Sequence, residues 1–156
     1  MNFEEKLKFG KISELKIEKY FYENGYNIIL TNEYTGRDNN KAPQLFNIIK
    51  NLTLPDLDIS KGGKRFWVEV KHYTTAPLNR KYNIYVHGIK KRHYDDYLLV
   101  EKSTGSPVYL YIDEEESKKI LWAELIKLKT YPCLFPHEHN DQCLIYFDRN
   151  DFNALH

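Results

Sequence analysis

The most restrictive feature of this 156-residue chain is a pair of strand-like segments joined by a tight glycine turn. Leu54–Ile59 and Phe66–Tyr73 are rich in apolar and β-branched residues, as strands are. Between them lies Lys61-Gly62-Gly63-Lys64, which is typical of a hairpin connection because glycine accepts the backbone angles of a tight turn. The two segments are therefore expected to pair as neighbouring antiparallel strands.

Side chains alternate between the two faces of a strand, so every second residue shares a face. In the second segment this places Glu69 and Lys71 beside Trp67, with apolar residues on the opposite face. Asp56 and Asp58 share a face of the first segment, and strand pairing brings one of them close to Glu69. Carboxylates forced together repel unless a cation joins them, and Mg²⁺ or Mn²⁺ prefers such oxygen ligands. The pattern favours a metal site over the alternative, a surface hairpin with exposed ion pairs.

The other segments predict an α/β domain with a mixed β-sheet flanked by helices. Residues 12–24 are expected to form a helix that ends before Gly25, because glycine is the common residue just past a helix end. A polar loop is expected over residues 32–43. The remaining expected strands are 26–31, 108–113, 120–123 and 144–147, and the remaining helices are 90–102 and 124–129.

Pro55-Asp56, followed after twelve residues by Glu69-Val70-Lys71, resembles the signature of the PD-(D/E)XK nuclease superfamily. That superfamily includes restriction endonucleases, Holliday junction resolvases and repair nucleases. The resemblance covers roughly residues 10–112 and implies a restriction endonuclease-like core with the order αβββαβ. The expected organisation is a single nuclease-like domain, 1–156, with residues 113–156 added to that core.

The resemblance implies an Mg²⁺- or Mn²⁺-dependent endonuclease that hydrolyses phosphodiester bonds in DNA. Asp56 and Glu69 would ligate the metal, with the carbonyl of Val70 as a further ligand. Lys71 would orient or activate the attacking water and stabilise the charged phosphate. The rival hypothesis is a non-catalytic nucleic-acid-binding module on a nuclease-like fold.

Two further carboxylates each have two alternative roles in this scheme. Many superfamily members add a glutamate from the first helix, and Glu14 is the position that fits, near apolar residues expected to face the sheet. The alternative for Glu14 is an ordinary surface glutamate. Asp58 is either a second ligand or a salt-bridge partner of Lys71, although the motif favours Asp56.

The charge of the chain is distributed unevenly. Its net charge is only +1, but residues 61–93 carry nine lysines and arginines against one acid, so this window is +8 and the rest of the chain −7. A local positive surface attracts a polyanion, and the alternative is that these side chains solvate loops. The candidate nucleic-acid contacts are Lys61, Lys64, Arg65, Arg80, Lys81, Lys90, Arg92 and His93, and the candidates for base stacking are Tyr73, Tyr82 and Tyr85.

The end of this basic window has a resemblance of its own. Residues 87–98, which begin His87-Gly88-Ile89, resemble small nuclease-like proteins of phages and mobile elements. The stretch 104–108 that follows shares this resemblance. In that scheme Lys90, Arg92 and His93 open a helix behind the active site and face substrate phosphate.

A separate cluster supports a third hypothesis, a zinc-stabilised binding protein. Cys133, His137, His139 and Cys143 are four zinc-competent ligands within eleven residues, although their spacing is not that of a standard zinc finger. The alternative is that Cys143 begins a core strand and the histidines are hydrated.

Composition excludes several other classes. No apolar run approaches the ~18 residues that a membrane span needs, and two cysteines cannot build a disulfide framework. We therefore expect a cytoplasmic protein with no membrane partner. The superfamily resemblance implies duplex or branched DNA as its partner. The oligomeric state stays open, although the resemblance allows a homodimer.

Overall fold

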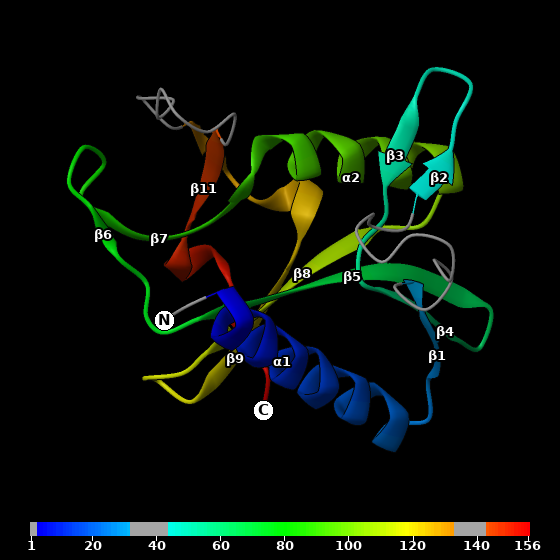
Figure 1. The fold of residues 1–156 in the computed structure, drawn as a ribbon, viewed down its shortest axis with the longest axis horizontal. Helices are drawn as coiled ribbons and strands as arrows, with labels where there is room; N and C mark the ends of the chain where they lie inside the picture. The colour runs from blue at the N-terminus through cyan, green and yellow to red at the C-terminus, as the bar shows by residue number, and fades with distance from the viewer. Residues whose placement is uncertain (1–2, 32–43, 133–142) are drawn as a thin grey trace.

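The chain folds around a six-stranded mixed sheet (Figure 1). The structure is a computed structural model that describes residues 3–31, 44–132 and 143–156. The α-helices and strands of the first half are α1 (Phe3–Glu23), β1 (Asn27–Leu30), β2 (Gln44–Phe46), β3 (Asn51–Thr53), β4 (Leu57–Lys61), β5 (Lys64–Tyr73) and β6 (Leu78–Asn79). Those of the second half are β7 (Ile84–Lys90), α2 (Lys91–Thr104), β8 (Val108–Glu114), β9 (Lys119–Glu124), β10 (Tyr131–Pro132), β11 (Leu144–Asp148) and β12 (Asn153–Ala154).

The six-stranded sheet has the order β1-β4-β5-β8-β9-β12. Its central pair, β5 and β8, is parallel, and the other neighbours are antiparallel. Parallel neighbours need a long crossover, which here includes α2. The arrangement confirms the predicted mixed sheet flanked by helices.

The predicted hairpin is confirmed, and its turn explains the two glycines. Lys61 pairs with Lys64, so the connection contains only Gly62 and Gly63. Both have positive φ, 57° and 78°. A two-residue turn that matches the right-handed twist of the flanking strands requires such angles, and glycine adopts them without strain. Leu57 lies opposite Val68, and this register sets which side chains of β4 and β5 are neighbours.

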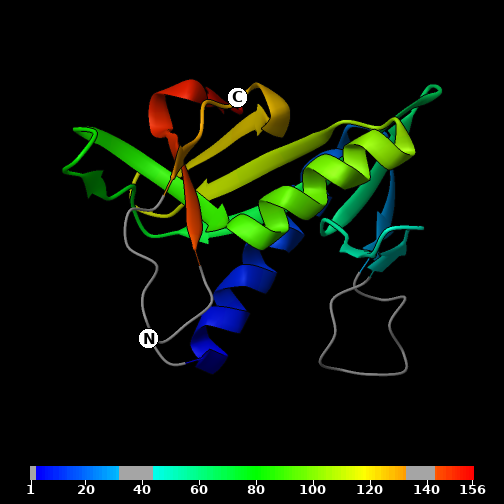
Figure 2. The same ribbon diagram turned by 90° about the horizontal axis from the view of Figure 1, so that it is seen from above.

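The two long helices cover opposite faces of the sheet, α1 on one and α2 on the other (Figures 1 and 2). Ile17 and Phe21 of α1 pack on Val68 and Val70 of β5, as the predicted alternation requires. On the other face Tyr97 and Val100 of α2 pack with Trp67, Leu110 and Ile112. The strand β5 is therefore buried on both faces, which makes any charge within it expensive.

The sequence prediction missed a second sheet. It has the order β10-β11-β7-β6, and β7 runs directly into α2. Gly88 in the middle of β7 lies under the ring of Tyr146, where a Cβ atom would come within 2.9 Å of a ring carbon. The expected helix over 124–129 is a 3₁₀ turn, Leu125–Lys127, and a second such turn is Arg149–Asp151.

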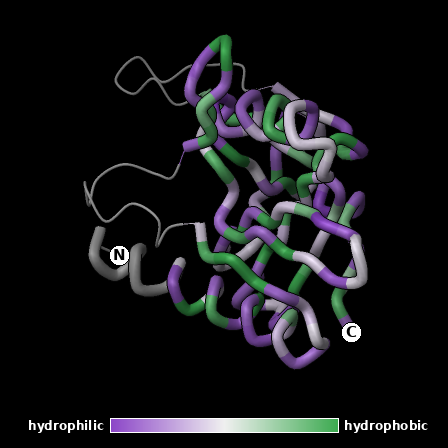
Figure 3. The backbone as a smooth tube through the Cα atoms, turned by 90° about the vertical axis from the view of Figure 1, so that its right-hand side faces the viewer, coloured by the Kyte–Doolittle hydropathy of each residue, from purple (hydrophilic) through white to green (hydrophobic). Residues whose placement is uncertain are grey.

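Also unpredicted is the β2–β3 hairpin, which projects from the body of the fold (Figure 3). Its connection carries the exposed side chains of Ile48 and Ile49. Lys50 holds the hairpin to α2 through an ion pair with Asp96, 2.6 Å long. No helix in the described parts of the chain is long and apolar enough to span a membrane.

A buried carboxylate holds the C-terminal segment to the end of β8. Both oxygens of Glu114 accept hydrogen bonds from Arg149, at 2.8 and 2.7 Å, and Ser117 and His87 also contact them. Arg149, more than the other partners, holds the pKa of Glu114 at about 2, below its ordinary value of 4.5. The ionised form of Glu114 therefore stabilises the fold.

We expect acid to destabilise the fold through Glu114. Because its folded pKa is lowered, the stabilisation is present above pH 4.5 and is lost as pH falls towards 2. The loss amounts to at most about 3 kcal/mol in the free energy of unfolding. Urea unfolding at a series of pH values measures it, and Arg149→Met should flatten the dependence in this range. Arg80→Met, a change at an exposed arginine, is the matched control; equal slopes for both variants would contradict the assignment.

Candidate active site

Asp56 lies in the segment that leads into β4, and Thr31 fixes its backbone. The amide and hydroxyl groups of Thr31 both donate to the carbonyl of Asp56, at 3.1 and 2.8 Å. The Asp56 carboxylate turns towards β5, where Oδ2 accepts a hydrogen bond of 2.8 Å from the amide of Val70. Asp56 is therefore held beside the backbone that joins Glu69 to Lys71.

Glu69 and Lys71 extend from β5 towards the same region. Glu69 is 2% exposed, and its Oε1 forms an ion pair with the ammonium of Lys71. Its other oxygen, Oε2, is buried and accepts no hydrogen bond from the described part of the chain. A buried carboxylate oxygen without a donor is unfavourable, so the position can accept a cation or a polar ligand.

The charges of these three residues interact strongly. Burial, and then the negative charge of Glu69, raise the pKa of Asp56 well above its ordinary value. Burial alone would lower the pKa of Lys71, but the charges of Glu69 and Asp56 outweigh this effect and raise it. Lys71 is therefore held protonated between two carboxylates that repel each other.

Glu14 of α1 also reaches this cluster. Its side chain is half-buried, and burial raises its pKa, with further contributions from the charges of Glu18 and Glu69. The charge of Lys71 lowers the pKa of the same carboxyl group and so opposes these effects. The structure thus brings Glu14 into electrostatic contact with both charged residues of β5.

Two residues of α2 complete the surroundings. Burial lowers the pKa of His93, and the charge of Glu69 opposes this shift. Tyr97 is 2% exposed, and burial, followed by the charges of Glu69 and Asp56 and a side-chain hydrogen bond to Glu69, raises its pKa well above the ordinary value. The rings of His93 and Tyr97 lie 5.8 Å apart. Tyr97 was not among the predicted site residues, since nothing in its spacing along the helix reveals that it lies near Glu69.

The donor set fits a hard divalent cation. Two carboxylates lie close enough to repel each other, one of their oxygens is buried without a donor, and oxygen is the ligand that Mg²⁺ and Mn²⁺ prefer. Within residues 3–31, 44–132 and 143–156, no group of three or more His, Cys, Asp or Glu side chains is gathered for metal binding. A metal here would therefore use Asp56, Glu69 and non-side-chain ligands such as the predicted Val70 carbonyl or water.

Asp58 does not join the cluster. Both of its oxygens accept hydrogen bonds from Arg65, at 2.8 Å each. The Arg65 guanidinium also lies over the ring of Trp67, 4.7 Å from its centroid. Asp58 therefore pairs with Arg65 rather than with Lys71, and Arg65 is committed to contacts within the sheet.

The predicted nucleic-acid contacts fall into three separate places. Lys61, Lys64 and Arg65 surround the β4–β5 turn, whereas Arg80 and Lys81 belong to the β6–β7 connection on the opposite side of the molecule (Figure 1). Lys90, Arg92 and His93 lie at the start of α2. Of the three groups, this last one lies nearest to the carboxylates, because the charges of Glu69 and Lys71 act on His93.

The remaining candidates lie elsewhere. Cys133, His137 and His139 are outside the described residues, and Cys143 immediately precedes β11. Of the tyrosines proposed for base stacking, Tyr73 donates to the carbonyl of Gly88, and Tyr82 packs on Tyr131 with ring centroids 5.0 Å apart. Tyr85 is 56% exposed.

Comparison with known proteins identifies the fold but no sequence relative. No protein-family model matches the chain, and no curated protein matches its sequence. Among solved structures, the Holliday junction resolvase Hjc of the archaeon Archaeoglobus fulgidus is similar, with a TM-score of 0.60 at 11% identity over 94% of this chain and 89% of that one. D212, a nuclease from a fusselovirus, has a TM-score of 0.46 at 11% identity over 97% of this chain and 84% of that one. The similarity to Hjc confirms the fold prediction: this chain has the restriction endonuclease-like fold.

Proposed function

We propose that this protein is a metal-dependent endonuclease that hydrolyses phosphodiester bonds in DNA. The observation that carries the proposal is the buried Glu69 oxygen without a donor, next to the Asp56 carboxylate and the Lys71 ammonium. Keeping such charges inside a sheet costs stability, and sites of this kind are typical of catalysis. The fold, shared with a Holliday junction resolvase, supports the same assignment.

Asp56 and Glu69 would hold Mg²⁺ or Mn²⁺, with the Val70 carbonyl as a further ligand. When bound, the metal supplies positive charge that polarises the scissile phosphate. Because its pKa is raised, Lys71 stays protonated at neutral pH and donates hydrogen bonds rather than removing a proton. Its role would be to orient the attacking water and to stabilise the negative charge that develops on the phosphate.

The start of α2 is the best-supported DNA contact. Lys90 and Arg92 are exposed there, and His93 lies within the electrostatic range of Glu69. Backbone phosphates bound at these side chains would present a phosphodiester to the carboxylates, with an affinity that falls as salt increases. Only DNA that extends beyond the site would contact Lys61, Lys64, Arg80 and Lys81. A homodimer that joins two such sites remains a prediction.

We expect cleavage of supercoiled or branched DNA that requires Mg²⁺ or Mn²⁺ and stops with EDTA. Glu69→Gln and Lys71→Met should each reduce the rate on the order of 100-fold or more, because each removes a charge at the reacting phosphate. Glu115→Gln, on an exposed turn, is the matched control. Gel assays of the products measure the rates. DNA binding without cleavage in any metal would instead favour the non-catalytic module.

The metal site can be tested without cleavage through the stability of an Asp56→Asn variant. The amide oxygen keeps the hydrogen bond from Val70, but the repulsion from Glu69 disappears. We expect the metal-free variant to be more stable than the natural protein by about 1 kcal/mol, and to gain nothing from added Mg²⁺. Urea unfolding at or above neutral pH measures both effects.

The control for that experiment is Asp58→Asn, two residues further along the chain. It weakens the bidentate pair with Arg65, so it should lower stability while leaving the Mg²⁺ response intact. An Mg²⁺ response that survives in Asp56→Asn would contradict the assignment of Asp56 as a ligand.

A variant of Glu14 tests whether this residue belongs to the active site or is an ordinary surface glutamate. We expect Glu14→Gln to slow cleavage about tenfold, because its carboxylate lies near both Glu69 and Lys71. Glu23→Gln is matched to it, since Glu23 is on the same helix, is exposed and forms an ion pair of 3.7 Å with Lys19. Equal rates for the two variants would place Glu14 outside the active site.

A further inference from the structure

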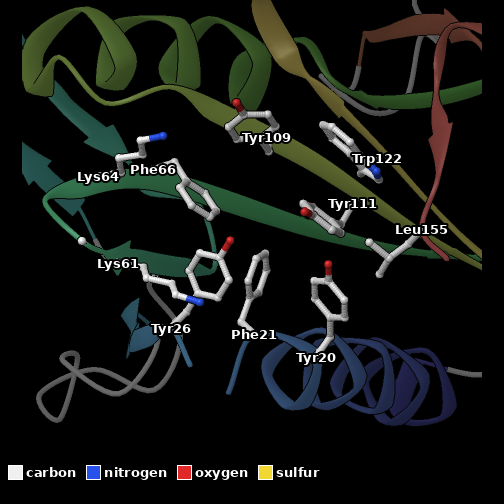
Figure 4. Close-up of a pocket in the computed structure, with 11 residues that line it drawn as sticks. Tyr20, Phe21, Tyr26, Lys61, Lys64, Phe66, Tyr109, Tyr111, Trp122 and Leu155 are labelled. Atoms are coloured by element: carbon white, nitrogen blue, oxygen red, sulfur yellow. The ribbon is translucent and has the colours of Figure 1, made fainter. Parts of the chain in front are cut away.

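An aromatic pocket lies on the α1 face of the sheet, away from the candidate active site. It has a volume of about 610 Å³, within the ~300–1,000 Å³ range of small-molecule sites (Figure 4). Seven aromatic side chains line it, together with Lys61, Gly62, Lys64 and Leu155; the aromatic ones are Tyr20, Phe21, Tyr26, Phe66, Tyr109, Tyr111 and Trp122.

The rings form a continuous wall. Phe21 lies at its centre, with ring centroids 5.2 Å from Tyr26 and 5.5 Å from Tyr111. Tyr111 in turn stacks on Trp122, with centroids 6.4 Å apart and ring planes 20° apart. Tyr26 and Trp122 are only partly buried against the core, so part of each ring remains accessible. A planar aromatic ligand could stack on these surfaces.

The rim of the pocket is cationic. Lys61 donates to the carbonyl of Asn24 and lies 4.8 Å from the centre of the Tyr26 ring. Lys64 is exposed and makes no ion pair with the described residues. Within the described part of the chain, no acidic side chain lines the pocket. The rim therefore favours an anion beside the aromatic wall.

The pocket also contains hydrogen-bonding groups. Burial raises the pKa of Tyr111, and the hydroxyls of Tyr20, Tyr109 and Tyr26 raise it further, which places these phenol groups near one another. In Figure 4 the hydroxyls of Tyr20, Tyr26 and Tyr111 point into the space between α1 and the sheet. Such groups can donate to or accept from the edge of a nucleobase.

From the aromatic wall, the exposed Lys64 cation at the rim and the phenol groups, we infer that this pocket binds a nucleotide that is not base-paired. The base stacks on the rings, and its phosphate lies at Lys64. The pocket is separate from the carboxylates, because Lys61 is five residues along from Asp56, about 17 Å in an extended strand. The inference stands on its own observations and does not require the chain to be a nuclease.

Trp122 gives a site-specific probe. The chain has two tryptophans, so Trp67→Phe leaves Trp122 as the sole indole. In EDTA, thymidine 5′-monophosphate and a short single-stranded oligothymidylate should quench the Trp122 fluorescence, whereas a blunt duplex should not. Quenching by the oligonucleotide alone would assign the pocket to an unpaired nucleotide within a strand, and quenching by both would assign it to the nucleotide itself.

Two variants test the ring and the cation separately. Tyr26→Leu should weaken binding about tenfold or more by removing a stacking surface, and Lys64→Glu should weaken it similarly by reversing the charge. Tyr22→Leu and Lys102→Glu, at exposed side chains of α1 and α2 outside the pocket lining, are the matched controls and should change nothing. Lys64→Glu changes an exposed side chain, so it keeps the test valid if Tyr26→Leu does not fold.

Equilibrium dialysis of the natural protein with labelled nucleotide repeats the measurement without the Trp67 change. No binding by either method, or equal affinities in all four variants, would overturn the inference. A concentration-dependent dimer that buries Trp122 and excludes nucleotide would overturn it as well, because a second copy would then occupy the pocket. Failure of DNA cleavage leaves these results unaffected, so the two proposals can fail independently.

Discussion

Repulsion between carboxylates at the middle of β5 is the constraint on which the candidate site depends. Glu69 is almost fully buried, and its charge raises the pKa of Asp56 and acts on Glu14, His93 and Tyr97. Lys71 offsets only part of this charge, because one oxygen of Glu69 stays without a donor in the described part of the chain. A sheet buried on both faces tolerates such a group when a ligand compensates it. The compensation is incomplete in the protein alone, and this is why the cluster indicates a cation.

The parts of the fold that were predictable are those set by local chemistry. Gly62 and Gly63 specify a turn with positive φ, and alternation along β5 specifies that Glu69 and Lys71 share a face. Gly105 likewise ends α2 in the left-handed conformation, with φ 67°, and α2 extends two residues past the predicted end at 102. Each of these features follows from a few neighbouring residues, so a single sequence is sufficient to predict it.

The parts that were missed depend on contacts between distant segments. The strand over residues 84–90 was not predicted, and in the fold the ring of Tyr146 on β11 occupies the space that Gly88 leaves. Tyr97 was not predicted at the site, because its contact with Glu69 follows from the crossing of α2 over β5. The +8 window was expected to form a local positive surface, but its basic residues divide among two turns, the start of α2 and, for Lys71, the interior of β5. The sequence predicted that this window is basic, but not where its side chains lie in the fold.

The two proposed sites lie at opposite ends of the β4–β5 hairpin, where the backbone is arranged differently. At the Asp56 end the segment before β4 leaves the ladder, and Thr31 holds the backbone so that a carboxylate can face β5. At the turn end the strands stay paired as far as Lys61 and Lys64, which places two ammonium groups beside aromatic rings. The first end concentrates negative charge, which suits a cation, and the second concentrates positive charge, which suits a phosphate. A nucleic-acid strand bound at both ends of the hairpin would therefore have to pass from one face of the sheet to the other. An unpaired strand does this more easily than a duplex, because an unpaired strand bends at low cost.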